Sequence, residues 1–407
     1  MLRKFLFNVH WLIGISIGMV LALMGVSGAI LVFEDEILSL LNGRPGYVVP
    51  MESRLTPEQV LIAAQAVHPD QSVSALVVSA DPERAVKAEF GAQRRGRPTQ
   101  DNGSVWINPY TGGVKSAYAP RGQAFMATVQ DLHRELMLGA AGDHEDNGQQ
   151  HNERNGDHRF SLGKLITSTA VLCLLIMAGS GLYLRWPRRK ASEWRTWLKI
   201  HWRLKGYAFN YNLHAVLGTV VFVGYLLSAH SGLMMSEMGW YKDGVNKVAG
   251  VAPRRRDEEN QSSPPLTRSA PDQLTMLWSA FQREVPDYAV ATLQFGSSTE
   301  QELKINYLMN EPVTKKGGRN TSTIVLDAQS GAVVTHQRFS DKSVLQKIVE
   351  RNFDLHSGGY FGIGGRILML FTSLMMPVLL VTGWLQYLAR RKQKQQRAAA
   401  LKAAQSS

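Results

Sequence analysis

Four long stretches of the chain are almost entirely apolar and contain no Asp, Glu, Lys or Arg. They are residues Val9–Phe33, Leu165–Leu184, Leu213–Met235 and Ile367–Ala389. Each has the roughly 20 residues that a helix needs to cross a bilayer, so the pattern predicts four transmembrane helices. We interpret the first as a retained helix and not as a signal peptide, because it is too long for a signal-peptide core and no clear A-x-A site follows it.

The segments between these helices differ in charge. Arg3 and Lys4 precede the first helix, RWPRRKASEWRTWLKIHWRLKG joins the second to the third, and RRKQKQQR follows the fourth. Basic connections stay in the cytoplasm, so both termini are expected there, and the two long connections are expected outside. The net charge of +12 therefore mainly reflects topology and does not require nucleic acid as a partner. The same charge is also compatible with binding of anionic membrane lipid.

The two outside connections have similar patterns. In the first, LTPEQVLIAAQAVHPD predicts a helix capped by Thr56 with Pro57 in its first turn, and strand-like pieces follow up to VWINPYTGGVKSA. In the second, SAPDQLTMLWSAFQREVPD predicts a helix, and strand-like pieces end at STIVLDAQSGAVVTH. Strand, glycine-containing turn and strand close both segments, which predicts two small α+β domains.

Several motifs occur twice in the same order. The first and third helices open with H-x3-G, at His10–Gly14 and His214–Gly218, and later carry VSG and HSG in matching register. The second and fourth helices are preceded by D-L-H-x5-G, with His133 and His356, and end with GLYLRWPRRK and GWLQYLARRK. This order indicates an internal duplication.

The predicted fold is therefore an integral membrane α-helical protein, a four-helix transmembrane bundle with an internal 2+2 parallel repeat and two outside α+β domains. Two helices per repeat give both halves the same orientation, with a pseudo-twofold axis along the membrane normal. The predicted boundaries are as follows: transmembrane helices at 1–40, 161–186 and 211–236; outside domains at 41–130 and 237–353; a DLH motif with a His-rich loop at 131–160; a basic cytoplasmic loop at 187–210; a DLH motif with the fourth helix at 354–390; and a cytoplasmic tail at 391–407.

Matched histidines can face each other across such an axis and ligate one haem iron. We expect His10 to face His214 and His133 to face His356. Gly14 and Gly218 share a helix face with His10 and His214 and leave space there for a flat macrocycle. Cys173 is the only cysteine, which excludes an intrachain disulfide, a Cys-ligated iron–sulfur cluster and C-x-x-C-H haem attachment.

Other interpretations of these residues stay open. His10 can be an interfacial residue beside Trp11, with Gly14 in a helix-packing face, and each DLH motif can be a local helix cap. His230 has no matched histidine in the first half. As an ionisable residue within the membrane it is a candidate ligand or proton relay, or a histidine that bonds a neighbouring helix. An insertion places three further histidines at even spacing, where they could contact a metal or substrate or form a mobile polar loop. They are His144, His151 and His158.

Together these motifs resemble the PepSY-associated transmembrane family of bacterial inner membranes. The resemblance rests on HWLIG, MGVSGAILVFEDE, WINPYTGGV, LHRELMLG, NLHAVLG, LHSGGYFGIGGR and VTGWLQYLARR. It implies PepSY-like outside domains. Some members are siderophore reductases that carry haem b, which makes the four matched histidines haem-ligand candidates. No G-x-G-x-x-G follows a strand and opens a helix, so electrons are expected from a donor protein or a quinol and not from a bound nicotinamide or flavin.

Two functions follow from this resemblance. In the first, two b haems pass electrons across the inner membrane to a ferric siderophore outside, and ferrous iron is released. In the alternative, the chain is a non-enzymatic PepSY membrane module that binds a periplasmic protein or modulates a peptidase. The paired histidines distinguish the two functions, because a docking module has no need of them.

Overall fold

The computed structural model describes residues 1–42, 46–90, 104–117, 121–138, 161–186, 197–251, 273–295, 302–310 and 320–406. The chain divides into two compact units, each assembled from segments that are distant in sequence. The helical unit comprises Met1–Glu34, Ala124–Lys242 and Phe353–Ser407. The sheet unit comprises Asp35–Gln123 and Asp243–Asn352.

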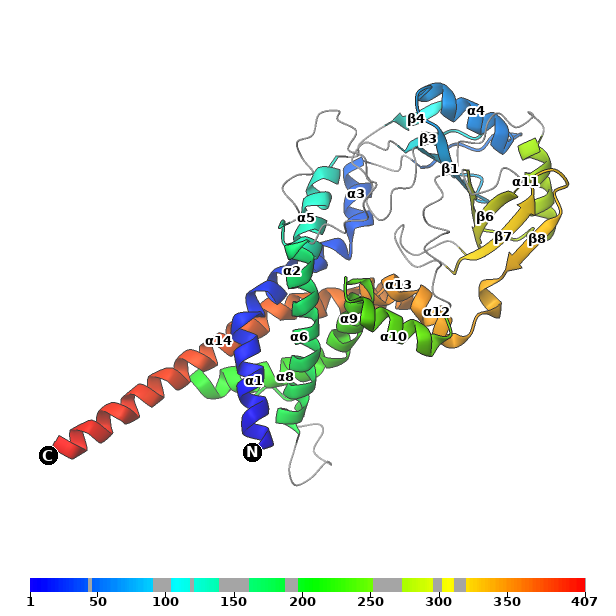
Figure 1. Ribbon diagram of the computed structural model, residues 1–407. Coiled ribbons are helices and arrows are strands. Elements are labelled where there is room, and N and C mark those ends of the chain that lie inside the picture. Colours follow the sequence, from blue (N-terminus) through cyan, green and yellow to red (C-terminus); the bar gives the residue numbers. More distant parts are fainter. Residues whose placement is uncertain are drawn as a thin grey trace. The chain divides into compact units, whose positions relative to one another are not determined.

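Long helices build the helical unit (Figure 1). They are α1 (Leu2–Ser16), α2 (Gly18–Leu31), α5 (Gln123–Glu135), α6 (Leu162–Arg185), α8 (Gly206–Val220), α9 (Phe222–Met235) and α14 (Gly362–Ser406), with the short α13 (Asn352–Ser357) and the 3-10 turn η4 (Gly359–Phe361) before α14. Helix α14 packs along α2 and α8, and α6 packs along α1 and α9. Their apolar faces enclose a core that includes Leu21, Leu174, Tyr225 and Leu233.

Two of the predicted spans are not single straight helices. Helices α1 and α2 bend by 61° around Ile17, and α8 and α9 bend by 57° around Val221. At the first bend, a Cβ on Gly18 would lie 2.7 Å from Leu380 Cδ1, so glycine permits the close approach of α14. The face of His230 relative to His214 therefore cannot be derived from one straight helical wheel, because the two residues lie on helices with different axes.

The apolar helices support a membrane protein. Among the described residues, α6 and the helix Gly359–Gln405 are each long and apolar enough to cross a membrane. The number of such spans rises to as many as four if each bent pair counts as one. The chain is thus a largely helical protein with apolar spans, as its sequence predicts.

In its described residues, the sheet unit contains an antiparallel sheet with strand order β4-β3-β2-β1-β5-β6-β7-β8. The strands are β1 (Val73–Ser79), β2 (Val86–Phe90), β3 (Val105–Ile107), β4 (Val114–Ala117), β5 (Val290–Gln294), β6 (Glu302–Leu308), β7 (Ser322–Asp327) and β8 (Val333–Gln337). The sequence predicts two separate α+β domains, but β1 pairs with β5 in register Leu76↔Leu293 and joins the two segments. This pairing removes two edges that separate four-stranded sheets would expose.

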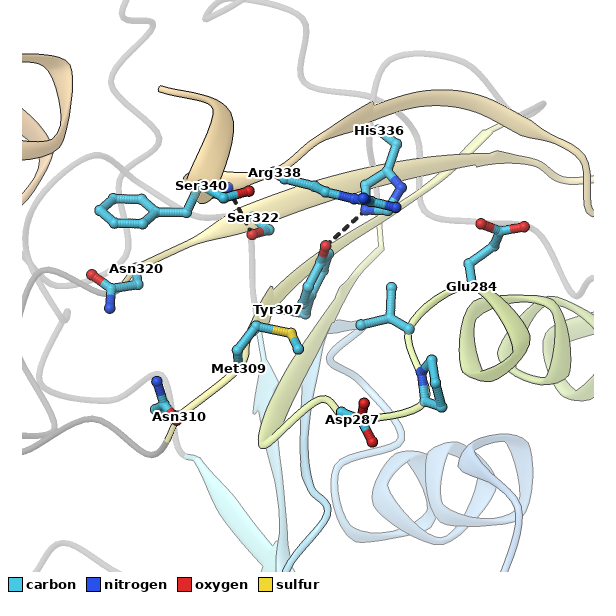
Figure 2. Close-up of a pocket in the computed structure, with 13 residues that line it drawn as sticks. Glu284, Asp287, Tyr307, Met309, Asn310, Asn320, Ser322, His336, Arg338 and Ser340 are labelled. Atoms are coloured by element: carbon cyan, nitrogen blue, oxygen red, sulfur yellow. Dashed lines mark hydrogen bonds between the residues drawn. The ribbon is translucent and has the colours of Figure 1, made fainter. Parts of the chain in front are cut away.

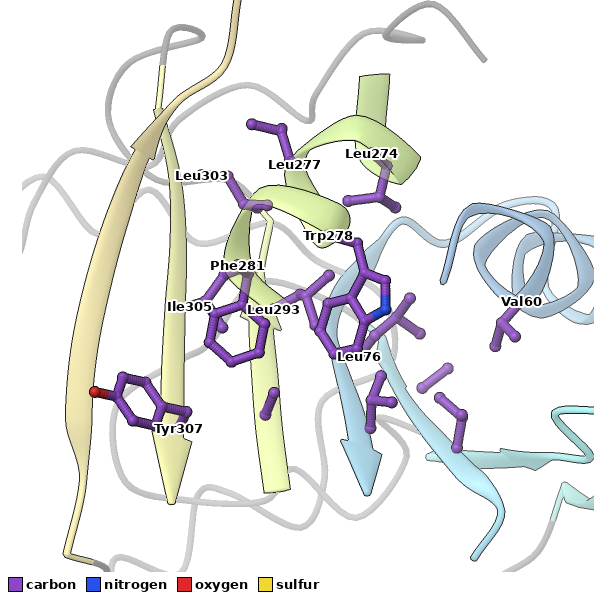
Figure 3. Packing of buried hydrophobic residues seen from close by; sticks show 14 of the residues in the cluster. Val60, Leu76, Leu274, Leu277, Trp278, Phe281, Leu293, Leu303, Ile305 and Tyr307 are labelled. Atoms are coloured by element: carbon purple, nitrogen blue, oxygen red, sulfur yellow. The ribbon is translucent and has the colours of Figure 1, made fainter. Parts of the chain in front are cut away.

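Two helices, α4 (Pro57–Val67) and α11 (Gln273–Glu284), pack on this sheet. Thr56 caps α4 in a capping box with Gln59, as predicted. Side chains from both helices and from β1, β5 and β6 form one continuous core, in which Trp278 and Phe281 of α11 lie over Leu293 and Ile305 (Figure 3). The remaining elements are α3 (Glu34–Asn42), α10 (Gly239–Ala249), η3 (Phe339–Asp341) and α12 (Val344–Glu350).

Candidate functional site

His10 and His214 face each other in the helical unit. His10 lies on α1 and His214 on α8, and their ring centres are 6.4 Å apart with the ring planes at 84°. Each ring lies against a glycine of a neighbouring helix: His10 against Gly181 of α6, and His214 against Gly383 of α14. The fold thus joins the two H-x3-G motifs at one place.

His133 and His356 form a second facing pair. His133 lies at the end of α5 and His356 in α13, with ring centres 6.0 Å apart and the ring planes at 64°. Burial lowers the pKa of His133, and burial together with the neighbouring His133 lowers the pKa of His356 to about 4. Both imidazoles are therefore neutral near pH 7, the form in which a histidine ligates a metal.

All four rings are held in the same way, through Nδ1. A hydroxyl on a neighbouring helix lies within hydrogen-bonding distance of each Nδ1. The distances are 3.0 Å from His10 to Ser180 Oγ, 2.9 Å from His214 to Thr382 Oγ1, 3.2 Å from His133 to Ser27 Oγ and 2.9 Å from His356 to Ser231 Oγ. Because Nδ1 is engaged, Nε2 is the nitrogen through which each ring can bind a metal.

The ring-centre separations of both pairs are compatible with a bis-histidine haem. A metal–imidazole nitrogen bond is about 2.0–2.1 Å long, as in zinc sites, and the nitrogen lies about 1 Å from the ring centre. Two imidazoles on opposite sides of one metal therefore place their ring centres about 6 Å apart, as in both pairs. The described residues contain no group of three or more His, Cys, Asp or Glu side chains that could hold a metal ion. Two facing histidines suit haem, because its macrocycle supplies the other four ligands.

The two glycines expected to make room for a macrocycle have different surroundings. No described atom lies within 4 Å of where a Cβ on Gly218 would stand, so α8 borders open space there. A Cβ on Gly14 would stand 3.5 Å from Met177 Cε, which is ordinary van der Waals contact.

His230 belongs to neither pair. Its Nδ1 lies 2.7 Å from the hydroxyl oxygen of Tyr241, and the two rings meet edge-on with centres 5.9 Å apart. This contact corresponds to the predicted alternative of a histidine bonded to a neighbouring helix, since Tyr241 lies on α10. His144, His151 and His158 lie outside the described residues.

Sequence reasoning missed the hydroxyl residues that hold the four imidazoles. Ser27, Ser180, Ser231 and Thr382 are all at least 95% buried. A signal was present, because VSG and HSG recur in register and each contains one of these serines. The sequence alone did not show that each serine bonds a histidine of a distant segment.

The sheet unit contains a separate cleft of about 500 Å³ (Figure 2). Tyr307 and His336 meet in it through a 2.7 Å hydrogen bond between the Tyr307 hydroxyl and His336 Nε2. Glu284, Asp287 and Arg338 also line it. Burial and the charge of Arg338 lower the pKa of His336, so its imidazole is neutral near pH 7.

Comparison with known proteins gives one family match. The model of the PepSY-associated TM region matches residues 7–390, which includes both histidine pairs and both segments of the sheet unit. No curated protein shows significant similarity to the chain.

Proposed function

The chain belongs to the family of the PepSY-associated TM region, and on this premise we propose that it is a di-haem b reductase of the bacterial inner membrane. It passes electrons across the membrane to a ferric siderophore in the periplasm and releases ferrous iron. In this proposal each bent helix pair is one span, so that four spans form two parallel repeats, and both termini are cytoplasmic. The PepSY-like segments, joined in the sheet unit, then lie in the periplasm.

The observation that carries the proposal is the presence of two facing histidine pairs. Each pair joins segments that are far apart in sequence, and each has ring centres at the separation that bis-histidine ligation needs. Buried histidines with no ligand role do not require a partner imidazole at this distance. A docking module would have no use for two such pairs.

The residues of the chain would bind and orient two haems. His10 and His214 would hold the first, and His133 and His356 the second, each through Nε2. Bound haem supplies one-electron chemistry, with a potential that its axial ligands and their hydrogen bonds adjust. The open space beside Gly218 would be available to part of the first haem, and the surrounding apolar helices would exclude water from it.

The charge pattern of the sequence supports a direction of transfer. His10 follows Arg3 and Lys4, and His214 follows the basic segment that ends at Lys205. The positive-inside rule assigns both basic segments to the cytoplasm. The haem that His10 and His214 would hold is therefore the one that would accept electrons from a donor protein or a membrane quinol. The haem that His133 and His356 would hold would supply the one-electron chemistry that converts the ferric chelate to the ferrous form. Ferrous iron has a lower charge density than ferric iron, so it binds the hard oxygen donors of a siderophore more weakly and is released.

An absorption spectrum of the purified full chain, oxidised and then reduced with dithionite, tests the proposal. We expect the sharp reduced α band of bis-histidine haem b, and a pyridine haemochrome assay that gives two haems per chain. Protein from haem-replete cells that contains no haem would contradict the reductase and favour the non-enzymatic PepSY module. One haem per chain would remove one of the two pairs from the proposal.

A further inference from the structure

We propose that four Ser/Thr–Gly dipeptides, one for each paired histidine, are positioning elements that fix the Nδ1–H tautomer and leave Nε2 free to bind metal. This inference rests on the proposed function, since it names what orients the axial ligands. The dipeptides are Ser180–Gly181 for His10, Ser27–Gly28 for His133, Thr382–Gly383 for His214 and Ser231–Gly232 for His356.

The hydroxyl proton of each dipeptide is already used within its own helix. Ser27 donates to the Leu23 carbonyl at 2.8 Å and Ser231 to the Leu227 carbonyl at 2.6 Å. Thr382 and Ser180 likewise donate to carbonyls of the preceding turn, those of Val378 and Met177. A hydroxyl has one proton, so its oxygen can only accept from the imidazole, and Nδ1 must carry the hydrogen.

A backbone carbonyl near His133 Nδ1 leads to the same conclusion. The Met24 carbonyl oxygen lies 2.9 Å from His133 Nδ1, and a carbonyl can only accept. A backbone group of the equivalent residue lies beside each of the other three rings, that of Met177 for His10, Leu379 for His214 and Ser228 for His356. At all four histidines the backbone group belongs to the residue three positions before the Ser or Thr. We call this residue, the Ser or Thr and the following Gly the seat of the histidine.

The glycine explains why this carbonyl is accessible. In a helix the carbonyl of residue i bonds the N–H of residue i+4, and the side chain at i+4 covers its flank. Here residue i+4 is the glycine in every seat, so the imidazole can reach both the carbonyl and the hydroxyl through the notch that the missing side chain leaves. Each seat therefore consists of the residue that provides the carbonyl, two intervening residues, the Ser or Thr that provides the hydroxyl, and the Gly.

A Cβ on each glycine would approach its histidine to a different extent. It would lie 3.0 Å from Cε1 of His133 at Gly28 and 3.2 Å from Cε1 of His10 at Gly181. It would lie 3.5 Å from Cε1 of His214 at Gly383 and 4.0 Å from Cε1 of His356 at Gly232. The His10–His214 pair thus has a tight position at Gly181 and a more tolerant one at Gly383, which provides a matched comparison within the chain. At Gly232 the added Cβ would also lie 3.2 Å from Val171 Cγ1.

The glycine series is tested on the purified full chain. We expect Gly28→Ala to displace His133 and weaken haem binding at the His133–His356 centre by about 10–100-fold, as loss of supporting contacts does at metal sites. We expect Gly181→Ala to weaken haem binding at the His10–His214 centre, and Gly383→Ala to weaken it much less. Gly179→Ala is the control on α6, since no described atom lies within 4 Å of its added Cβ. Equal losses of haem binding in Gly28→Ala and Gly179→Ala, or in Gly181→Ala and Gly383→Ala, would contradict the proposed role of the glycines.

The hydroxyl series is read from the midpoint potential. A Nδ1–H that bonds a strong acceptor makes the imidazole a better electron donor to iron and so favours the ferric state. Thr382→Val should therefore raise the potential of the His10–His214 centre and leave the other centre unchanged, and Thr382→Ser should restore it. Ser27→Ala should raise only the potential of the His133–His356 centre. Unchanged potentials in both Thr382→Val and Ser27→Ala would overturn the positioning role of the hydroxyls.

A haem-independent measurement separates this inference from the proposed function. Nitrogen-15 NMR of histidine-labelled full chain from haem-deficient cells reports which ring nitrogen is protonated, and single His→Ala variants assign the signals. We expect Nδ1–H at all four positions. That result supports the seats even if the protein never binds haem, in which case the reductase alone fails. An Nε2–H tautomer at these histidines would overturn the seats whatever the haem content.

Discussion

Ser231 Oγ of α9 lies 2.9 Å from His356 Nδ1, although the two residues are 125 positions apart in the sequence. The same hydroxyl donates to the Leu227 carbonyl, so one buried group ties the short helix α13 to the apolar helix α9. Ser27 of α2 contacts His133 Nδ1 in the same way and ties α5 to α2. Through these bonds the two DLH histidines, which lie outside the apolar helices, are fixed against them and against each other.

The first prediction concerns which histidines share a centre. We expect His10→Ala and His214→Ala each to remove the same haem, because their rings face each other, and His133→Ala and His356→Ala each to remove the other. The amount of haem per protein should fall by about half in each single variant, because a haem that has lost one of its two histidine ligands is held too weakly to be retained. Redox-resolved spectra identify the remaining centre.

His230→Ala is the control for this set. His230 bonds Tyr241 and lies in neither pair, so the variant should keep both haems. If His214→Ala kept all haem while His230→Ala lost one, the assignment of ligands would be wrong.

The second prediction concerns the ferric spectra. The ring planes are at 84° in the His10–His214 pair and at 64° in the His133–His356 pair. Steeply crossed axial imidazoles leave the iron orbitals nearly degenerate, so low-temperature EPR should show two strongly anisotropic low-spin signals. His10→Ala should remove the more anisotropic of the two. A rhombic spectrum typical of parallel imidazoles would contradict the ring geometry.

The third prediction follows from the proposed direction of transfer. Dithionite-reduced protein should be reoxidised by a ferric siderophore, and a ferrous-specific chelator should trap the product. Reoxidation should be much slower in His133→Ala than in His10→Ala, because a bilayer core of roughly 30 Å is too thick for one haem to serve both faces quickly. Equal rates in wild type and His133→Ala would contradict this polarity.

The fourth prediction concerns the shared sheet. Phe281 is fully buried in the core that both segments of the sheet unit contribute to. Phe281→Ala should lower the free energy of unfolding of that unit by about 3–5 kcal/mol, the usual range for a buried aromatic side chain. Because β1 and β5 are paired, hydrogen exchange in the full chain should quicken in both strands together.

Ile62→Ala is the control for the sheet prediction, because Ile62 is 62% exposed on α4. It should leave exchange in both strands close to wild type. Faster exchange in β5 alone after Phe281→Ala would indicate two independent domains, as the sequence predicts.

The sequence by itself determined the apolar helices and the matched histidines. Runs such as Leu165–Leu184 contain no charged residue. Because a charged side chain is costly inside a bilayer, the composition of such a run identifies it as a membrane span without any knowledge of its packing. The cap of α4 was also predictable, because Thr56 and Gln59 satisfy each other locally. The H-x3-G and D-L-H motifs each occur twice, and this repetition identified the four histidines as candidates without knowledge of their contacts.

Only the tertiary structure decided how these parts meet. The bends at Ile17 and Val221, the pairing of β1 with β5, the contact of His230 with Tyr241 and the choice of hydroxyl for each histidine were not available from the sequence. Each joins side chains or strands whose separation depends on the packing of whole helices or on the pairing of sheet edges. A helical pattern shows which face of a segment is apolar, but the neighbour that covers this face is fixed only when all segments pack together.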